Sequence, residues 1–272
     1  MTKSKRVPAI LLALLLVLLL LPACELKPAA PFQLGPYREG GGRGERQRVL
    51  GNGDVHDEID INADMRGEEW TLRIEAARFT PGVAKIIIDE SLSFAGKLET
   101  DSNLREAGLT REYNLSRREI VLRGKPNQWY APTVLNFSVG VPVNRIIVNG
   151  AVKIEYDCPS VTECGLELNG AVNGNFKFGA LKALRVDING TGDCMFFGTS
   201  QRAEIELNGA AQVKAFGLTA RDAAVTINGA GECEITAEDI LRAEINGVGS
   251  VIYDGDPRVD RAVHGLGSVR KR

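Results

Sequence analysis

An Asn-Gly dipeptide recurs through the C-terminal half of the chain, and its spacing constrains the fold more than any other feature of the sequence. The successive intervals are 20, 20, 19, 20, 18 and 18 residues, the last one ending at His264-Gly265. The asparagines of the series are Asn149, Asn169, Asn189, Asn208, Asn228 and Asn246. A near-constant period of this length is typical of a repeat protein, in which each unit packs against its neighbours in the stack.

Apolar and polar residues alternate around each Asn-Gly pair, which is the pattern of a strand with one buried face. Apolar residues stand one and three places before the asparagine, as Ile205 and Leu207 do before Asn208. They also stand five and seven places after it, as Val213 and Ala215 do. Glycine directly after the asparagine gives the backbone room to turn. The repeating unit is therefore predicted to be strand, turn, strand, turn.

Two architectures are compatible with Asn-Gly turns between strands. A β-sandwich or meander uses such turns in antiparallel hairpins. A solenoid stacks its coils, so it needs the same class of inward residue at a fixed offset in every unit. The fixed offsets favour the solenoid. The sequence thus predicts an all-β, right-handed parallel β-helix, the hand being that of parallel connections, with coils of 18–20 residues in the C-terminal half.

The segment from Val55 to Pro142 contains strand-like runs without the strict period, so less regular coils are expected there. A short helical turn is expected near residues 103–107. Nothing in this segment has the composition of a linker. Residues 53–272 are therefore predicted to form a single domain.

Residues 1–23 have the composition of a secretory signal peptide. Lys3, Lys5 and Arg6 precede a Leu-rich apolar run, and Pro22 follows it. The run is shorter than the roughly 20 apolar residues that a transmembrane helix needs. A cleaved signal is therefore expected.

The end of this signal resembles the lipobox of bacterial lipoproteins, with Leu21 and Ala23 before Cys24. The resemblance implies that Cys24 is acylated and tethers the protein to a membrane. Glu25 follows the cysteine, which favours the outer membrane. Residues 24–52 are rich in Pro, Gly and Arg and have little to bury, so they are predicted to form a flexible tether.

The charge of the chain excludes several partners. It carries 33 Lys and Arg against 35 Asp and Glu, a net charge of −2 that becomes −5 once the three charges of the signal are removed. A nucleic-acid phosphate backbone is not expected to bind such a surface. The apolar content of 44% also argues against intrinsic disorder.

The repeat resembles the GIN-domain family of adhesin head domains, found on bacterial envelope and secreted proteins. The segments that carry the resemblance are Asn136–Pro142, Ile227–Glu232, Ile245–Val251, Tyr253–Pro257 and His264–Val269. The family implies a β-helix with a surface or envelope role. It supplies no catalytic residues that can be carried over to this sequence.

The cysteines of the repeat region are expected to be structural. Cys194 and Cys233 occupy the same inward position two coils apart, or about 10 Å by the strand spacing, which is beyond the reach of a disulfide. Cys158 and Cys164 bracket a five-residue insertion, so a disulfide between them is a possible pairing in an oxidising envelope. Zinc binding is less favoured because no histidine is close in the sequence.

Two sets of residues are candidates for binding. Glu167, Asp187, Glu206 and Glu244 share an outward position, so they are predicted to form a charge ladder, relieved either by a cation or by neighbouring arginines. Trp129-Tyr130 is a candidate contact for a sugar ring or a partner, with burial as the alternative.

No motif for nucleotide binding or for nucleophilic catalysis appears in the sequence. The hypothesis is therefore a lipid-anchored envelope protein that acts as a non-catalytic binding or adhesion-type scaffold. We expect a glycan or an envelope protein as its ligand and no cofactor, metal or catalytic residue. The alternatives are a carbohydrate-active β-helix enzyme and a purely structural envelope component.

Overall fold

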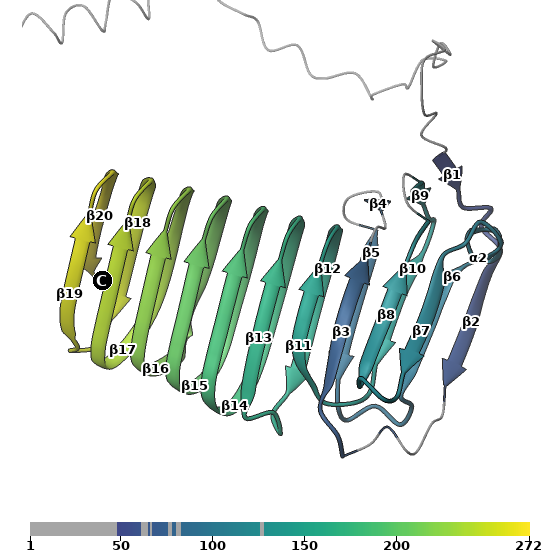
Figure 1. Cartoon of the computed structure of the whole chain (residues 1–272), viewed down its shortest axis with the longest axis horizontal. Helices are drawn as coiled ribbons and strands as arrows, with labels where there is room; N and C mark the ends of the chain where they lie inside the picture. The colour runs from purple at the N-terminus through teal and green to yellow at the C-terminus, as the bar shows by residue number, and fades with distance from the viewer. Residues whose placement is uncertain (1–47, 61–64, 66, 76–77, 80–82, 126–127) are drawn as a thin grey trace, which may run out of the picture. The chain divides into compact units, whose positions relative to one another are not determined.

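The computed structural model describes residues 48–272, apart from 61–64, 66, 76–77, 80–82 and 126–127 (Figure 1). The predicted signal peptide, the lipid attachment site Cys24 and most of the predicted tether lie outside the described residues. Strands dominate the described part of the chain. Its α-helix, α2 (Ser102–Glu106), lies where the sequence predicts a helical turn.

The C-terminal half is a stack of parallel coils. Each central coil is one long strand that bends part-way, and each pairs in parallel with the next. The long strands are β14 (Ala171–Ile188), β15 (Thr191–Leu207), β16 (Ala210–Ile227) and β17 (Ala230–Ile245). In this register Val186 pairs with Ile205, and Ile205 pairs with Val225. The predicted parallel solenoid is confirmed.

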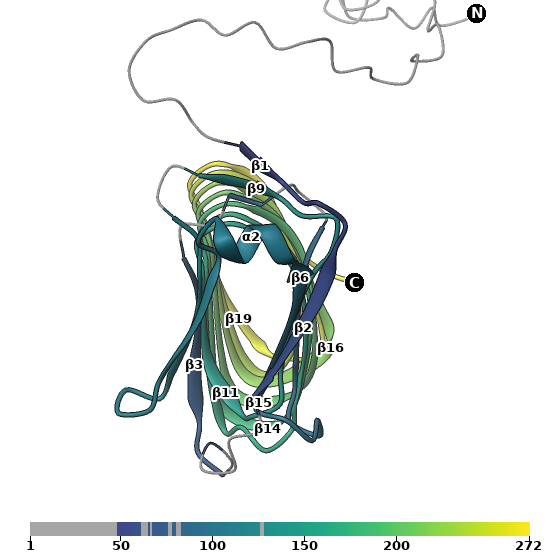
Figure 2. The same ribbon diagram turned by 90° about the vertical axis from the view of Figure 1, so that its right-hand side faces the viewer.

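Each coil contributes to two opposite faces, which Figure 2 shows as two walls around the interior. Face 1 consists of the strand segments before the Asn-Gly corners: β11 (Val143–Val148), β13 (Glu163–Leu168), the second halves of β14 to β17, and β19 (Arg258–Val263). Face 2 consists of the segments after the corners: β12 (Ala151–Cys158), the first halves of β14 to β17, β18 (Val248–Asp254) and β20 (Leu266–Lys271).

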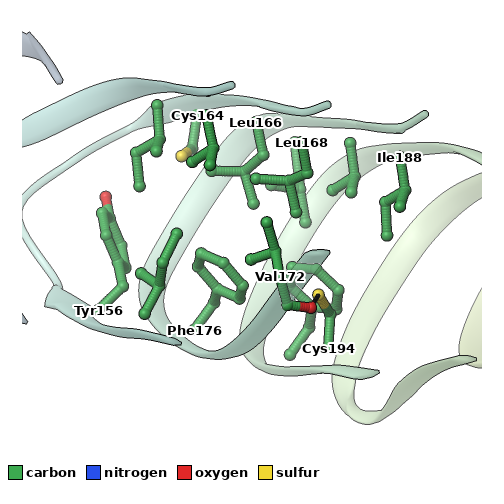
Figure 3. Packing of buried hydrophobic residues seen from close by; sticks show 14 of the residues in the cluster. Tyr156, Cys164, Leu166, Leu168, Val172, Phe176, Ile188 and Cys194 are labelled. Carbon is green, nitrogen blue, oxygen red and sulfur yellow. Dashed lines mark hydrogen bonds between the residues drawn. The ribbon is translucent and has the colours of Figure 1, made fainter. Parts of the chain in front are cut away.

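The inward residues of both faces fill the space between the walls (Figure 3). On face 2, the stacked rings of Phe176 and Phe196 have centroids 5.0 Å apart. The ring centroid of Tyr156 lies 5.2 Å from that of Phe178. The hydroxyl of Tyr156 donates a hydrogen bond to the carbonyl oxygen of Val143 at 2.7 Å, which satisfies its polar atom inside the core.

A ladder of asparagine side chains runs along the corner between the faces. Each amide donates through Nδ2 to the Oδ1 atom of the preceding asparagine, at distances such as 2.8 Å from Asn189 to Asn169 and 2.9 Å from Asn208 to Asn189. The glycines beside them stack equally closely, and a Cβ atom on Gly190 would lie 1.8 Å from the carbonyl oxygen of Gly170. The corner therefore requires glycine at this position.

The N-terminal half extends the same two faces, but not in chain order. Beyond β11, face 1 continues through β3 (Trp70–Glu75), β8 (Glu119–Arg123) and β7 (Thr110–Asn114). Beyond β12, face 2 continues through β5 (Ala84–Asp89), β10 (Leu135–Val139), β6 (Gly96–Asp101) and β2 (Val55–Asp60).

This half is less regular, as predicted, because its strands interleave. After β5 the chain skips one place in the stack to form β6 and β7, and it then returns to insert β8 and β10. Strand β6 is antiparallel to both of its neighbours, and β7 is antiparallel to β8. Helix α2 crosses this end of the stack in Figure 2. The antiparallel strands and the helix cover the end of the parallel ladder.

A small separate sheet adjoins this end, in the order β1 (Arg48–Leu50), β9 (Trp129–Ala131) and β4 (Arg78–Phe79). Strand β1 lies within residues 24–52, the segment predicted to be a tether. The buried carboxylate of Asp101 holds the turn that follows β1. It accepts hydrogen bonds from the backbone N–H groups of Gly53 and Thr133, both at 2.8 Å, and from the Thr133 hydroxyl at 2.6 Å.

Candidate binding surface on the outer side of face 1

Three adjoining open depressions form a surface that we name the charged trough. The middle depression has a volume of about 480 Å³. Its lining residues are Thr71, Arg73, Glu75, Arg117, Glu119, Arg123, Arg145 and Ile147. It shares residues with a depression over the β7–β8 hairpin and with another, of about 410 Å³, over β11, β13 and β14.

The trough follows from strand alternation and parallel register. Outward side chains of adjacent strands form rows across the face. One row runs through Glu119, Thr71, Arg145, Gly165 and Arg185, because each of these residues pairs with the next. Gly165 contributes no side chain, and a Cβ atom added there would meet only the Cγ atom of Arg145 at 3.9 Å. The gap between the two arginines at this position deepens the surface.

Arginine–carboxylate pairs line the middle of the trough. The Nε atom of Arg73 lies 2.8 Å from Glu119 and 3.3 Å from Glu75. The Glu75 carboxylate also lies 3.0 Å from a guanidinium nitrogen of Arg123. These side chains are part-exposed, so solvent screens their attraction and they contribute little to stability. Guanidinium donors and carboxylate acceptors together can hydrogen-bond a ligand rich in hydroxyl groups.

The predicted charge ladder forms one column on the same face. Register places Glu167 beside Asp187, Asp187 beside Glu206, and Glu206 beside Thr226, followed by Glu244. Arginine and asparagine side chains lie against these carboxylates. Arg145 pairs with Glu167, and Arg185 lies 3.0 Å from Asp187.

The remaining two acids of the column bind corner amides. The Nδ2 atom of Asn228 donates to Glu206 at 3.2 Å, and that of Asn246 donates to Glu244 at 2.9 Å. Within the described ranges, no group of three or more His, Cys, Asp or Glu residues is arranged to hold a metal ion. Arginine guanidinium groups and corner amides thus lie against the carboxylates of the column.

The two aromatic candidates, Trp129 and Tyr130, differ in their exposure to solvent. The side chain of Tyr130 is fully buried, and its hydroxyl accepts a hydrogen bond from the Lys125 backbone N–H at 2.9 Å. Burial raises the pKa of Tyr130. Tyr130 therefore does not reach a ligand at the surface, because strand alternation turns it inward. Trp129 is 40% exposed, and the Arg48 guanidinium lies 5.8 Å from its ring centroid.

Cys158 and Cys164 are both buried and carry free thiols in the structure, so the disulfide between them stays a prediction. Burial raises the pKa of Cys158 to about 11 and that of Cys164 to about 12. Cys194 and Cys233 are buried, free thiols, as expected for core residues.

Sequence reasoning missed the arginines and glutamates of the trough. Their signal was present as charged residues at alternating positions of Thr71–Glu75 and Glu119–Arg123. The two segments lie far apart in the chain, and only the pairing of β3 with β8 brings them together.

Residues 81–257 match the family model described as "Putative auto-transporter adhesin, head GIN domain". The chain belongs to this family. The matched segment begins just before β5 and ends just before β19, so it contains β11 to β18 but not the last coil, β19 and β20. The resemblance inferred from the repeat is confirmed. No curated protein matches the chain significantly.

Solved structures share the fold at low sequence identity. A "putative adhesin" from Bacteroides fragilis is 17% identical, with a TM-score of 0.64 over 82% of this chain and all of that chain. A "putative lipid binding protein" from Parabacteroides distasonis is 19% identical, with a TM-score of 0.55 over 83% of this chain and all of that one. At these identities the similarity establishes the fold alone. Among the described residues, no helix has the length and apolar character required to cross a membrane.

Proposed function

We propose that this protein is a lipid-anchored bacterial envelope protein that binds a linear polysaccharide, without catalysis, along the charged trough. Membership of an adhesin-like family supports an envelope or surface role. The signal and the lipobox-like Cys24 support an anchor in the outer membrane. The observation that carries the binding role is the open row of arginines and glutamates across β8, β3 and β11.

The geometry of the parallel ladder suits a linear polymer. Adjacent strands lie about 4.8 Å apart, so equivalent outward side chains repeat at that interval along the trough. This interval is comparable to the length of one sugar unit in an extended polysaccharide. Because the strands belong to a continuous hydrogen-bonded sheet, the row is held rigidly before the ligand arrives, which lowers the entropic cost of binding.

Filling the trough tests the proposal. Gly165→Trp places a large ring in the gap between Arg145 and Arg185, and the backbone there tolerates a Cβ atom. Ala224→Trp is the matched control, since Ala224 lies two coils beyond Arg185 in the same row. Binding to immobilised peptidoglycan sacculi, polygalacturonate and neutral glucan is measured with the full-length chain.

We expect at least one of these polymers to bind the wild-type protein. Gly165→Trp is expected to weaken that binding by about tenfold or more, a loss of roughly 1.4 kcal/mol, while Ala224→Trp leaves it unchanged. Equal effects of the two substitutions would place the ligand elsewhere. Binding of none of the polymers would favour the purely structural alternative.

One observation favours the second candidate, a carbohydrate-active enzyme. Glu75 and Glu119 approach one another through their shared partner Arg73, and paired carboxylates are the machinery of glycoside hydrolysis. In the present geometry both carboxylates are ion-paired with arginine, Glu119 with Arg73 and Glu75 with Arg73 and Arg123. We expect no release of reducing ends from a polymer that binds. Release that disappears in Glu119→Gln would establish the enzyme instead.

A further inference from the structure

The small sheet at the start of the described residues carries an exposed patch that neither the charged trough nor the core explains. Register in this sheet pairs Arg48 with Trp129 and Leu50 with Ala131. Because side chains alternate along a strand, Arg48, Leu50 and Trp129 lie on the same side of the sheet. The residues between them, Val49 and Tyr130, pair on the opposite side, and Tyr130 is fully buried there.

The three side chains of this patch are accessible and chemically distinct from their surroundings. Leu50 is 60% exposed and Trp129 is 40% exposed. Both are large apolar residues that the core leaves uncovered. The Arg48 guanidinium lies over the Trp129 ring, 5.8 Å from its centroid. Tryptophan, leucine and arginine together are typical of groups that sit at the headgroup level of a bilayer.

The position of the patch in the chain indicates what covers it. Arg48 is the first described residue, and 23 residues separate it from Cys24, the proposed lipid attachment site. A linker of that length, with the flexible composition predicted from its sequence, has a root-mean-square span of about 25–30 Å. An anchor at Cys24 would therefore hold the patch at high effective concentration beside the membrane, where even a weak interaction is populated.

We propose that the patch formed by Arg48, Leu50 and Trp129 docks on the surface of the bilayer in which the protein is anchored. This inference rests on the proposed lipid anchor. Trp129 and Leu50 enter the interfacial region, and Arg48 pairs with anionic lipid headgroups. Docking at this sheet gives the solenoid a fixed orientation on the membrane, so that its outer faces project from a defined base.

Tryptophan fluorescence tests this docking directly, because the described residues contain a matched pair of tryptophans. Trp70 is 2% exposed and donates its Nε1–H group to the carbonyl oxygen of Met65 at 2.9 Å. It is therefore a buried internal reference for the exposed Trp129. The full-length chain is expressed with its signal, purified from membranes and reconstituted in phosphatidylethanolamine and phosphatidylglycerol vesicles. Lipids brominated near the headgroup serve as quenchers.

We expect the lipids to quench wild-type fluorescence and to leave Trp129→Phe unquenched. Leu50→Asp is also expected to abolish quenching. Leu266→Asp changes a residue that is 78% exposed on the last strand, at the other end of the stack, and is expected to leave quenching intact. Co-sedimentation of each variant with vesicles is recorded in the same samples.

The outcomes separate the docking from the anchor. Co-sedimentation without lipid quenching of Trp129 would overturn the docking and leave the anchor standing. Failure to co-sediment would overturn both. Shielding of Trp129 from acrylamide by peptidoglycan sacculi, but not by vesicles, would assign the patch to a different occupant and would likewise overturn the docking.

Discussion

Replacing Phe196 by alanine tests the packing of the solenoid where its aromatic rings are stacked. Phe196 is fully buried on β15 and stacks on Phe176 at 5.0 Å. Truncating a buried phenylalanine costs about 3–5 kcal/mol, because it removes apolar contact and leaves a cavity. For an ordered domain of this size each kcal/mol lowers the melting temperature by about 2–4 °C. The expected decrease is therefore about 6–20 °C.

The adjacent residue provides the control. Phe197 follows Phe196 on the same strand, but it points outward and is 42% exposed. Phe197→Ala removes partly solvated area, so we expect a cost of about 1 kcal/mol or less and a decrease of less than about 4 °C. Thermal unfolding of the full-length variants is followed by circular dichroism and calorimetry. Equal effects at the two positions, or a larger effect at Phe197, would refute the assignment of inward and outward residues.

Three further predictions concern the corner, the N-terminal clamp and the thiols. Asn189→Ala removes two ladder hydrogen bonds, and Asn149→Ala removes one. In urea denaturation the free energy of unfolding should fall by about 1–3 kcal/mol for Asn189→Ala and by about 0.5–1.5 kcal/mol for Asn149→Ala. Equal losses would contradict a continuous ladder. Burial would raise the pKa of Asp101, but hydrogen bonds from Thr133 and Gly53 outweigh it and hold that pKa below its ordinary value. The ionised Asp101 therefore stabilises the fold above about pH 4, and this stabilisation is lost as the pH falls through the lowered pKa. The difference in melting temperature between wild type and Asp101→Asn should accordingly shrink in acid. A difference that is independent of pH would contradict this. In the oxidising envelope Cys158 and Cys164 should form a disulfide, which removes two hydrogens. After allowance for the substitution, the intact mass of the purified wild-type protein should be two hydrogens lower than that of its Cys158→Ser variant. Equal hydrogen counts would reject the bridge.

The regular half of the fold could be predicted because local and tertiary signals coincide there. Inward residues recur at fixed offsets from each Asn-Gly pair, and the stack places those offsets in register, as with Val186, Ile205 and Val225. The asparagine that shapes each corner also donates to the corner before it. The sequence of one coil therefore also specifies its contacts with the next coil.

The order of strands in the N-terminal half could not be predicted in this way. Its strands alternate as well, but their partners are distant in the chain and differ from strand to strand. Strand β10 pairs in parallel with β5 and antiparallel with β6, and no periodic sequence feature specifies either neighbour. The charged trough was missed for the same reason, since Arg73 meets Glu119 only through the pairing of β3 with β8.

The candidate site lies at the junction of the two halves, where β11 of the regular stack pairs with β3. In the regular coils, Asp187 has an arginine partner on its own strand, Arg185, whereas Glu206 accepts a hydrogen bond from Asn228 at the corner of the next coil. In the irregular half, Arg73 pairs with Glu75 on its own strand and with Glu119 on β8, so ion pairs cross the face and line a depression. A ligand in the trough would therefore contact an arrangement that exists only when the interleaved strands are assembled. Recognition of this kind depends on tertiary structure, whereas the repeated coils supply the rigid support behind it.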